Sequence, residues 1–286
     1  MNLPSGTDIA NLGELLAFYA EAGVDDALVE EAVDRFSQPA ASPLQSERRE
    51  SASGKQERPS PARHESRPRT EAPIRATAAI PDEGQAALAR ELAASANTLD
   101  ELRRHLEAFE GCNLKYTAKN TVFADGNPDA AVMLVGEAPG RDEDMEGLPF
   151  VGRSGQLLDR ILAAIGLDRT SAYIANVIAW RPPGNRTPTP HETEICRPFI
   201  ERQIELANPK VLVTLGGPSA KLLLNTTEGI LRLRGGWRQH VTKTGTVIPA
   251  MPTLHPAYLL RNPAHKKLAW RDFLEVKVRL RQLSGN

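Results

Sequence analysis

The chain has 286 residues, of which 41% are hydrophobic, and its formal net charge is −1 at pH 7. This length predicts one large domain with extensions, and the hydrophobic content is sufficient for a buried core. The sequence has no apolar run near the about 20 residues that a membrane span requires and no signal-peptide pattern in residues 1–16, so we expect a cytoplasmic protein without a membrane contact.

The N-terminal region, residues 1–36, predicts an acidic helical hairpin. Apolar residues from Leu12 to Tyr19 recur at helical spacing, and residues 1–38 carry eight acidic residues and one basic residue. Such a hairpin is suited to a protein partner, to packing on the main domain or to free motion, and the sequence leaves these alternatives open. Residues 37–85 are rich in Pro, Ser, Arg, Glu and Ala, which is typical of a disordered linker.

Residues 86–286 predict a folded domain in which helices and strands alternate. Such alternation favours a three-layer α/β/α architecture with a central, mainly parallel four-stranded sheet. The predicted helices occupy residues 86–108, 156–165, 191–206, 218–224 and 269–283. The predicted sheet strands occupy residues 132–135, 173–178, 210–216 and 247–251, and a short strand at 121–123 precedes them.

Three polar residues lie where these strands end. Glu137 comes directly after the first long strand, Asn176 lies near the end of the second, and His255 follows the last. Because the carboxyl ends of parallel strands lie at one edge of a sheet, we expect these side chains to converge on a ligand site there. Each also has an ordinary structural interpretation, as a loop carboxylate, a strand-end amide and a histidine before proline.

The segment HPAYLLR indicates contact with DNA. Leucines beside an arginine on a loop are suited to replace an extruded base while the arginine binds phosphate. The alternative is that Leu259 and Leu260 begin a core helix. Arg181 and Arg186, in the segment RPPGNRTPTP, are candidates for phosphate contacts or for a solvated turn. The C-terminal part of the chain carries an excess of basic residues, which agrees with a polyanion-binding surface.

Three segments together resemble the successive motifs of the family-4 uracil-DNA glycosylases: GEAPGRDEDMEGLPFVGRSGQLL, YIANVIAWRPPGNRTPTPHE and HPAYLLRNP. The resemblance implies a monofunctional DNA glycosylase that extrudes uracil from DNA and hydrolyses its N-glycosidic bond, leaving an abasic site and free uracil. It implies catalytic roles for Glu137, which positions water, Asn176, which reads the uracil edge, and His255, which supports the leaving base. The implied base contacts are Gly136, Ala138, Phe150 and Asn176. The implied DNA contacts are Ser154, Arg181, Arg186, Tyr258, Leu259, Leu260 and Arg261.

The chemistry of these residue types agrees with that implication. His255 can donate to O2 of uracil and Asn176 to O4, which stabilises charge that develops as the base leaves. An asparagine amide can also accept from N3–H, whereas cytosine presents the reverse pattern at this edge. Glu137 can orient water and favour a cationic sugar. No lysine occupies a recognised nucleophile position, so we expect no lyase step, and no metal is required.

One departure from the family concerns its iron–sulfur cluster. Family-4 enzymes hold a [4Fe–4S] cluster with four cysteines, whereas the corresponding positions here are Phe109, Cys112, Trp180 and Cys196. Two thiolates cannot supply four ligands, so the sequence predicts no cluster, aromatic packing in its place and two reduced core cysteines. A related subgroup traps uracil-DNA covalently through a histidine in a KRRIH insertion. The corresponding segment here, GNRTPTP, has neither the histidine nor the insertion, so we expect no covalent adduct.

Three alternatives remain open from the sequence. A glycosylase of broader range would act on xanthine, hypoxanthine or modified uracils, and a non-catalytic protein would bind DNA on the same fold. A nucleotide-binding enzyme is disfavoured, because GEAPG matches neither G-x-G-x-x-G nor G-x-x-x-x-G-K-[ST]. In each case we expect a monomer, with the acidic hairpin as the element suited to a protein partner.

Overall fold

The computed structural model describes residues 82–284, so the predicted hairpin and almost all of the predicted linker lie outside the described residues. None of the helices described there is long and apolar enough to cross a membrane. The helices are α2 (Asp82–Ser95), α3 (Leu99–Ala108), α4 (Leu114–Thr117), α5 (Arg141–Glu146), α6 (Arg153–Ile165), α7 (Pro190–Ala207), α8 (Gly217–Leu223), α9 (Ile230–Leu233), α10 (Pro256–Arg261) and α11 (Lys266–Ser284). The 3₁₀ turns are η2 (Pro183–Asn185) and η3 (Pro263–His265). The strands are β1 (Asp125–Gly126), β2 (Val132–Gly136), β3 (Tyr173–Asn176), β4 (Val211–Leu215), β5 (Arg238–Val241) and β6 (Val247–Thr253).

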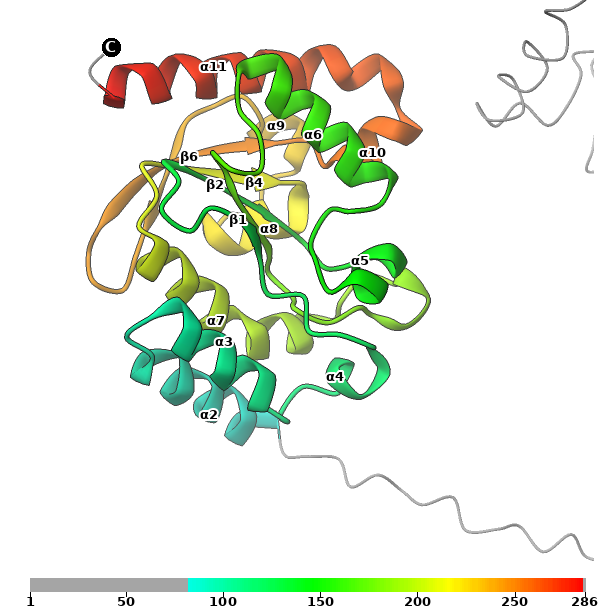
Figure 1. Cartoon of the computed structure of the whole chain (residues 1–286), viewed down its shortest axis with the longest axis vertical. Coiled ribbons are helices and arrows are strands. Elements are labelled where there is room, and N and C mark those ends of the chain that lie inside the picture. The colour runs from blue at the N-terminus through cyan, green and yellow to red at the C-terminus, as the bar shows by residue number, and fades with distance from the viewer. Residues whose placement is uncertain (1–81, 285–286) are drawn as a thin grey trace, which may run out of the picture. The chain divides into compact units, whose positions relative to one another are not determined.

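These strands form one sheet in the order β1-β3-β2-β4-β6-β5. The four central strands are parallel, and β1 and β5 pair antiparallel at the two edges. Helices α6 and α11 lie on one face of the sheet, and α2, α3 and α7 lie on the other (Figure 1). The predicted α/β/α architecture with four parallel strands is therefore confirmed. The prediction omits the edge strands because β1 has two residues and β5 buries only His240, so neither carries a clear apolar pattern.

Alternate residues of β2 divide the core between the two faces of the sheet. Val132 and Leu134 pack in one hydrophobic cluster with α6 and α11, whereas Met133 and Val135 pack in another with α2, α3 and α7. Successive side chains of a strand point to opposite faces, and helices cover both faces here. This explains why the strand reads as a continuous apolar run.

The single helix predicted for residues 86–108 is wrong, because the chain turns between α2 and α3. The hydroxyl of Thr98 accepts a hydrogen bond from the Glu101 backbone N–H at 3.1 Å. In return, the Glu101 carboxylate accepts one from the Asn97 backbone N–H at 2.8 Å. These bonds begin a new helix with a side-chain cap, and the apolar stripe continues across the break because both helices pack on α7.

Two further local predictions are wrong. Residues 121–123 belong to no strand, although the backbone N–H of Val122 donates to the carbonyl of Ala179 at 2.8 Å. The segment after His255, predicted as a loop, forms α10, since Pro256 favours the first helical position and His255 caps it. Residues 82–85, predicted to belong to the linker, form the first turn of α2.

The carboxyl ends of the parallel strands lie at one edge of the sheet. Gly136, the last residue of β2, pairs with Asn176, the last residue of β3. Leu215 at the end of β4 pairs with Thr253 at the end of β6. His255 follows two residues later, so the segments that carry the predicted polar residues all leave the sheet at this edge.

Candidate active site

The floor of the site is the backbone of Gly136. A β-carbon placed on Gly136 would lie 2.4 Å from Oδ1 of Asn176 and 2.6 Å from Cζ of Phe150. Such distances are shorter than any side chain tolerates, so only glycine permits this approach. The absence of a side chain on Gly136 thus brings the amide of Asn176 and the ring of Phe150 to one point above the end of β2.

The amide of Asn176 is buried but incompletely hydrogen-bonded. The residue is 6% exposed, and its Oδ1 has no hydrogen-bond partner within the described part of the chain. Buried polar atoms in folded proteins are nearly always paired, and an orphaned one is costly unless a ligand or water satisfies it. Asn176 therefore presents an acceptor suited to the N–H of a planar ligand lying above Gly136.

Phe150 and His255 form a second pair beside this amide. Their ring centroids are 5.5 Å apart with an interplanar angle of 29°, which is a stacked arrangement. Phe150 is 4% exposed and has a positive φ of 56°. The structure therefore brings together Gly136, Phe150, Asn176 and His255, which come from three separate segments of the sequence.

The hydrogen bonding of His255 indicates its tautomer. Its Nδ1 accepts a hydrogen bond from the backbone N–H of Ala257 at 3.1 Å and caps α10. Burial, together with the charge of Arg261, lowers the pKa of His255 to about 4. The ring is thus neutral at pH 7, and because Nδ1 accepts, the proton resides on Nε2 as a hydrogen-bond donor.

Glu137 is placed directly after the floor residue. The backbone N–H groups of Val177 and Ile178 donate to the carbonyls of Gly136 and Glu137, each at 3.0 Å, so β2–β3 pairing extends past the strand ends. Burial raises the pKa of the Glu137 carboxyl above its ordinary value. A carboxylate with a raised pKa is suited to accept a proton from water. Ala138 follows and packs against the core cluster of α7.

The acidic segment after this loop contains a residue that the sequence analysis does not single out. The carboxylate of Glu143 is buried and accepts hydrogen bonds from the backbone N–H groups of Gly140, Val151 and Gly152, at 3.0, 3.1 and 3.1 Å. It thereby ties the start of the loop to its end. Its position three residues after a helix-capping glycine is the signal that identifies this role.

The segment predicted to enter DNA differs from the expectation in one respect. Leu259 is 1% exposed and packs with Leu254 and Ala269, so the prediction that it is an exposed wedge is wrong. The side chain of Leu259 points inward because it lies on the side of α10 that packs against these apolar residues. Leu260, by contrast, is 36% exposed, and Arg261 is also exposed. The hydroxyl of Tyr258, a further predicted DNA contact, pairs with Nδ1 of His265 at 2.7 Å.

The remaining predicted DNA contacts lie at the start of α6 and in the connection between β3 and α7. Ser154 is in the first turn of α6 and is partly exposed. The guanidinium of Arg181 donates to Oδ1 of Asn185 at 2.7 Å. Arg186 forms a bidentate ion pair with Glu192, at 2.8 and 2.6 Å. Arg186 is therefore already engaged by a carboxylate, and a phosphate has to compete for it.

The residues at the cluster positions do not fit a [4Fe–4S] cluster. The chain contains two cysteines, and such a cluster needs four protein ligands. Sγ of Cys196 lies 4.0 Å from Sγ of Cys112, and both residues are buried. Phe109 and Trp180 are buried in the same hydrophobic cluster as the thiols. The hydrogen bond with Cys112, together with burial, raises the pKa of Cys196. The residues present thus supply two core thiols rather than four cluster ligands.

Comparisons with known proteins show which family the described domain is similar to. The family model of the uracil DNA glycosylase superfamily matches residues 123–274, which contain the whole sheet and α10. The type-4 uracil-DNA glycosylase of Archaeoglobus fulgidus is 39% identical over 183 residues, covering 63% of this chain and 92% of that protein. The corresponding enzyme of Sulfurisphaera tokodaii is 37% identical over 186 residues, covering 63% and 84%. That of Thermotoga maritima is 40% identical over 169 residues, covering 58% and 86%.

Proposed function

Since the chain belongs to the uracil-DNA glycosylase superfamily, we propose that it removes uracil from DNA by hydrolysing the N-glycosidic bond, as the first step of base excision repair. The observation that carries this proposal is the buried Oδ1 of Asn176, which has no partner in residues 82–284 and lies above the bare backbone of Gly136. Such an acceptor requires a ligand N–H, and the imide of uracil supplies one.

The oxygen and the nitrogen of the Asn176 side-chain amide together select uracil. Oδ1 of Asn176 accepts from N3–H of uracil, and the amide nitrogen donates to O4. Cytosine presents an unprotonated N3 and an amino group, so both contacts become repulsive or unpaired. A site built on hydrogen bonds to one edge of a base rejects the analogue that reverses them. Stacking on the ring of Phe150 holds the base in the plane where this reading takes place.

Bond cleavage uses the two remaining polar groups. The C1′–N1 bond breaks with its electron pair moving to uracil, and the sugar becomes oxocarbenium-like. The Nε2–H of neutral His255 donates to O2, where negative charge accumulates, so it stabilises the leaving anion. Glu137 as a carboxylate stabilises the cationic sugar and accepts a proton from the water that adds to C1′. The products are free uracil and an abasic site.

The DNA strand is held by groups around this edge. Leu260, exposed at the end of α10, fills the space that the extruded base vacates, while Arg261 pairs with phosphate. Ser154, in the first turn of α6, is the second phosphate contact, where backbone N–H groups also favour anions. The large basic excess of the C-terminal region attracts the DNA backbone.

Catalysis without an iron–sulfur cluster is the second part of the proposal. No step above uses the thiol of Cys112 or Cys196, and the aromatic side chains of Phe109 and Trp180 pack in the same core cluster as these thiols. Iron and acid-labile sulfide should be far below one cluster per chain in protein purified without oxygen. A visible absorption band accompanied by stoichiometric iron contradicts this part.

The test of the activity uses end-labelled oligonucleotides that contain a single uracil, thymine or cytosine. Strand cleavage is expected only for uracil and only after alkali, because hydrolysis leaves an intact abasic strand. Asn176→Ala and His255→Ala should each lower the single-turnover rate about 10²-fold or more. The matched control is Arg103→Gln, whose ion pair with Glu107 lies within α3, outside the basic C-terminal region. Binding of uracil-DNA without any cleavage by the unmodified chain contradicts the proposal.

A further inference from the structure

The backbone of Phe150 has a conformation that an aromatic residue adopts rarely. Its φ of 56° is in the left-handed region, where a β-carbon clashes with the following backbone, and such a conformation persists only where neighbouring groups enforce it. The ring is nevertheless the one that stacks on His255 and lies above Gly136. Some part of the structure therefore has to hold this backbone in place.

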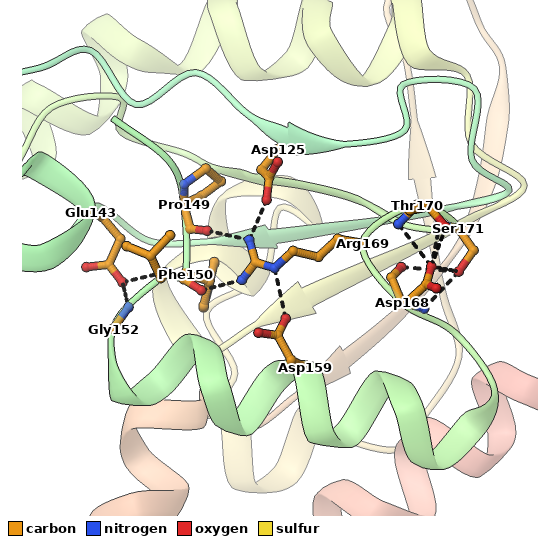
Figure 2. A network of polar contacts seen from close by, with 11 residues as sticks. Asp125, Glu143, Pro149, Phe150, Gly152, Asp159, Asp168, Arg169, Thr170 and Ser171 are labelled. Carbon is orange, nitrogen blue, oxygen red and sulfur yellow. Dashed lines mark hydrogen bonds and ion pairs between the residues drawn. The ribbon is translucent and has the colours of Figure 1, made fainter. Parts of the chain in front are cut away.

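Arg169, in the connection between α6 and β3, makes the contacts that hold it. Its Nη1 donates to the carbonyl of Pro149 at 3.1 Å, and its Nη2 donates to the carbonyl of Phe150. Figure 2 shows the guanidinium between these carbonyls and two carboxylates. Asp125 accepts from Nη1 at 2.5 Å and Asp159 accepts from Nε at 2.9 Å, so the two carboxylates hold the guanidinium from above and below in the view of Figure 2.

The peptide groups that follow Phe150 are held by an anionic side chain, in contrast to the cationic Arg169 that binds the preceding carbonyls. The Glu143 carboxylate accepts from the N–H groups of Val151 and Gly152. A cation thus binds the carbonyls before this point, and an anion binds the N–H groups after it. Gly155 completes the arrangement, since a β-carbon there would lie 1.6 Å from the Phe150 carbonyl oxygen. The turn is consequently clamped on three sides.

We propose that Arg169 is a positioning residue for base excision, which holds Phe150 in its left-handed conformation so that the ring stacks on the extruded base. This inference rests on the proposed function and adds a residue to it. Arg169 does not touch the base; it acts through the carbonyls of residues 149 and 150. A planar fork with five N–H donors can bind two successive carbonyls and two carboxylates at once, which a lysine ammonium cannot do.

The kinetic test compares Arg169→Gln in the natural chain and in a Phe150→Leu background. In the natural chain the single-turnover rate should fall by about tenfold or more, with the DNA-binding constant little changed, since misplacement of a positioning group affects the reacting geometry. In the Phe150→Leu background the same substitution should change the rate less than about twofold, because the ring it positions is absent. Arg169→Lys should resemble Arg169→Gln in rate. Equal losses in both backgrounds overturn the proposal.

A milder substitution guards against loss of the fold. Asp159→Asn removes one charged partner of Arg169 on the exposed face of α6 and leaves the core untouched. Its rate should fall in the same direction as that of Arg169→Gln, but by less, and the loss should again vanish with Phe150→Leu. A loss of rate that persists in the Phe150→Leu background contradicts the positioning role of Arg169.

A spectroscopic test is independent of catalysis. With 4-fluorophenylalanine at position 150, the natural chain should give one sharp fluorine resonance, and Arg169→Gln should broaden or split it. An unchanged resonance in that variant overturns the positioning role even if the rate falls. Failure of the natural chain to cleave uracil-DNA, in contrast, overturns the proposed function, and the fluorine spectra still decide whether Arg169 orders Phe150.

Discussion

Gly136 and Asn176 are register partners at the ends of β2 and β3, and the Asn176 side chain crosses the face of Gly136 within a distance that leaves no room for a β-carbon. The ring of Phe150 reaches the same point from the loop before α6. Under the proposed function, recognition of the base therefore depends on the absence of a side chain at Gly136 as much as on the side chains of Asn176 and Phe150.

Gly136→Ala tests this dependence. The new methyl would lie 2.4 Å from Oδ1 of Asn176 and 2.6 Å from Cζ of Phe150, so both side chains have to move out of the base site. The single-turnover rate on uracil-DNA should fall by about 10²-fold or more, as expected for a displacement near 1 Å at reacting groups. Stability should fall by only about 1–3 kcal/mol, because the clash is with side chains and not with backbone. A rate within twofold of the natural chain's, measured on folded protein, contradicts this account.

Asn176→Asp tests the origin of base selection. An ionised aspartate only accepts hydrogen bonds, so the donor to O4 of uracil is lost, whereas the amino group of cytosine gains a partner. The rate on uracil should fall by about 10²-fold or more, and the ratio of uracil to cytosine cleavage should narrow. Competition between the two bases in otherwise identical oligonucleotides measures this ratio directly. Asn225→Asp is the control, since Asn225 pairs with Arg197 away from the sheet edge.

The polar residues at the strand ends could be predicted from the sequence because the apolar runs of β2, β3 and β6 stop at chemically distinct residues. Parallel topology then places Asn176 and His255 at one edge, although about 80 residues separate them. The role of Arg169 could not be predicted in the same way. Two of its partners are the backbone carbonyls of Pro149 and Phe150, and no side-chain pattern marks a carbonyl that needs a guanidinium.

The burial of Leu259 could not be predicted from the sequence either. The HPAYLLR pattern is compatible with a loop or a helix, and the inward direction of the Leu259 side chain depends on its contacts with Leu254 and Ala269. The break between α2 and α3, in contrast, was readable from Asn97 and Thr98, which are good capping residues. Local chemistry is thus visible in sequence, whereas the direction of a side chain in a short helix is set by tertiary contacts.

The pH dependence of cleavage should have one acid limb, which belongs to Glu137. Burial raises the pKa of this carboxyl above 4.5, and the carboxylate is the active form, so the rate should increase as pH rises through that raised value. The pKa of His255 is about 4, so this ring titrates at lower pH than Glu137, whose pKa is raised above its ordinary value. Single-turnover rates of Glu137→Gln should be about 10²-fold lower and flat across the limb. A limb that survives in Glu137→Gln but disappears in His255→Asn reverses the assignment.

The titration of His255 should instead change how the free energy of unfolding depends on pH. The unfolded chain binds a proton at the ordinary histidine pKa of 6.5, whereas the folded chain does so only at about 4. The unfolded state therefore holds more protons between these values, and the free energy of unfolding decreases as pH falls from 6.5 towards 4. Urea unfolding of the natural chain and of His255→Asn, compared at both ends of this window, measures the contribution. The decrease should be smaller in the variant, and an identical decrease in both chains contradicts the depressed pKa.

The aromatic interior beside the two cysteines should carry a large share of the domain's stability. Trp180 is 1% exposed, packs in the core cluster of α2, α3 and α7, and donates from Nε1 to the hydroxyl of Thr121 at 3.0 Å. Trp180→Ala should lower the free energy of unfolding by about 3–5 kcal/mol, since it leaves a cavity and an unpaired hydroxyl. Trp270→Ala is the matched control, because Trp270 is 41% exposed on α11 and its removal should cost much less. Chemical denaturation of both variants provides the comparison, and equal losses would mean that Trp180 does not fill a tightly packed space.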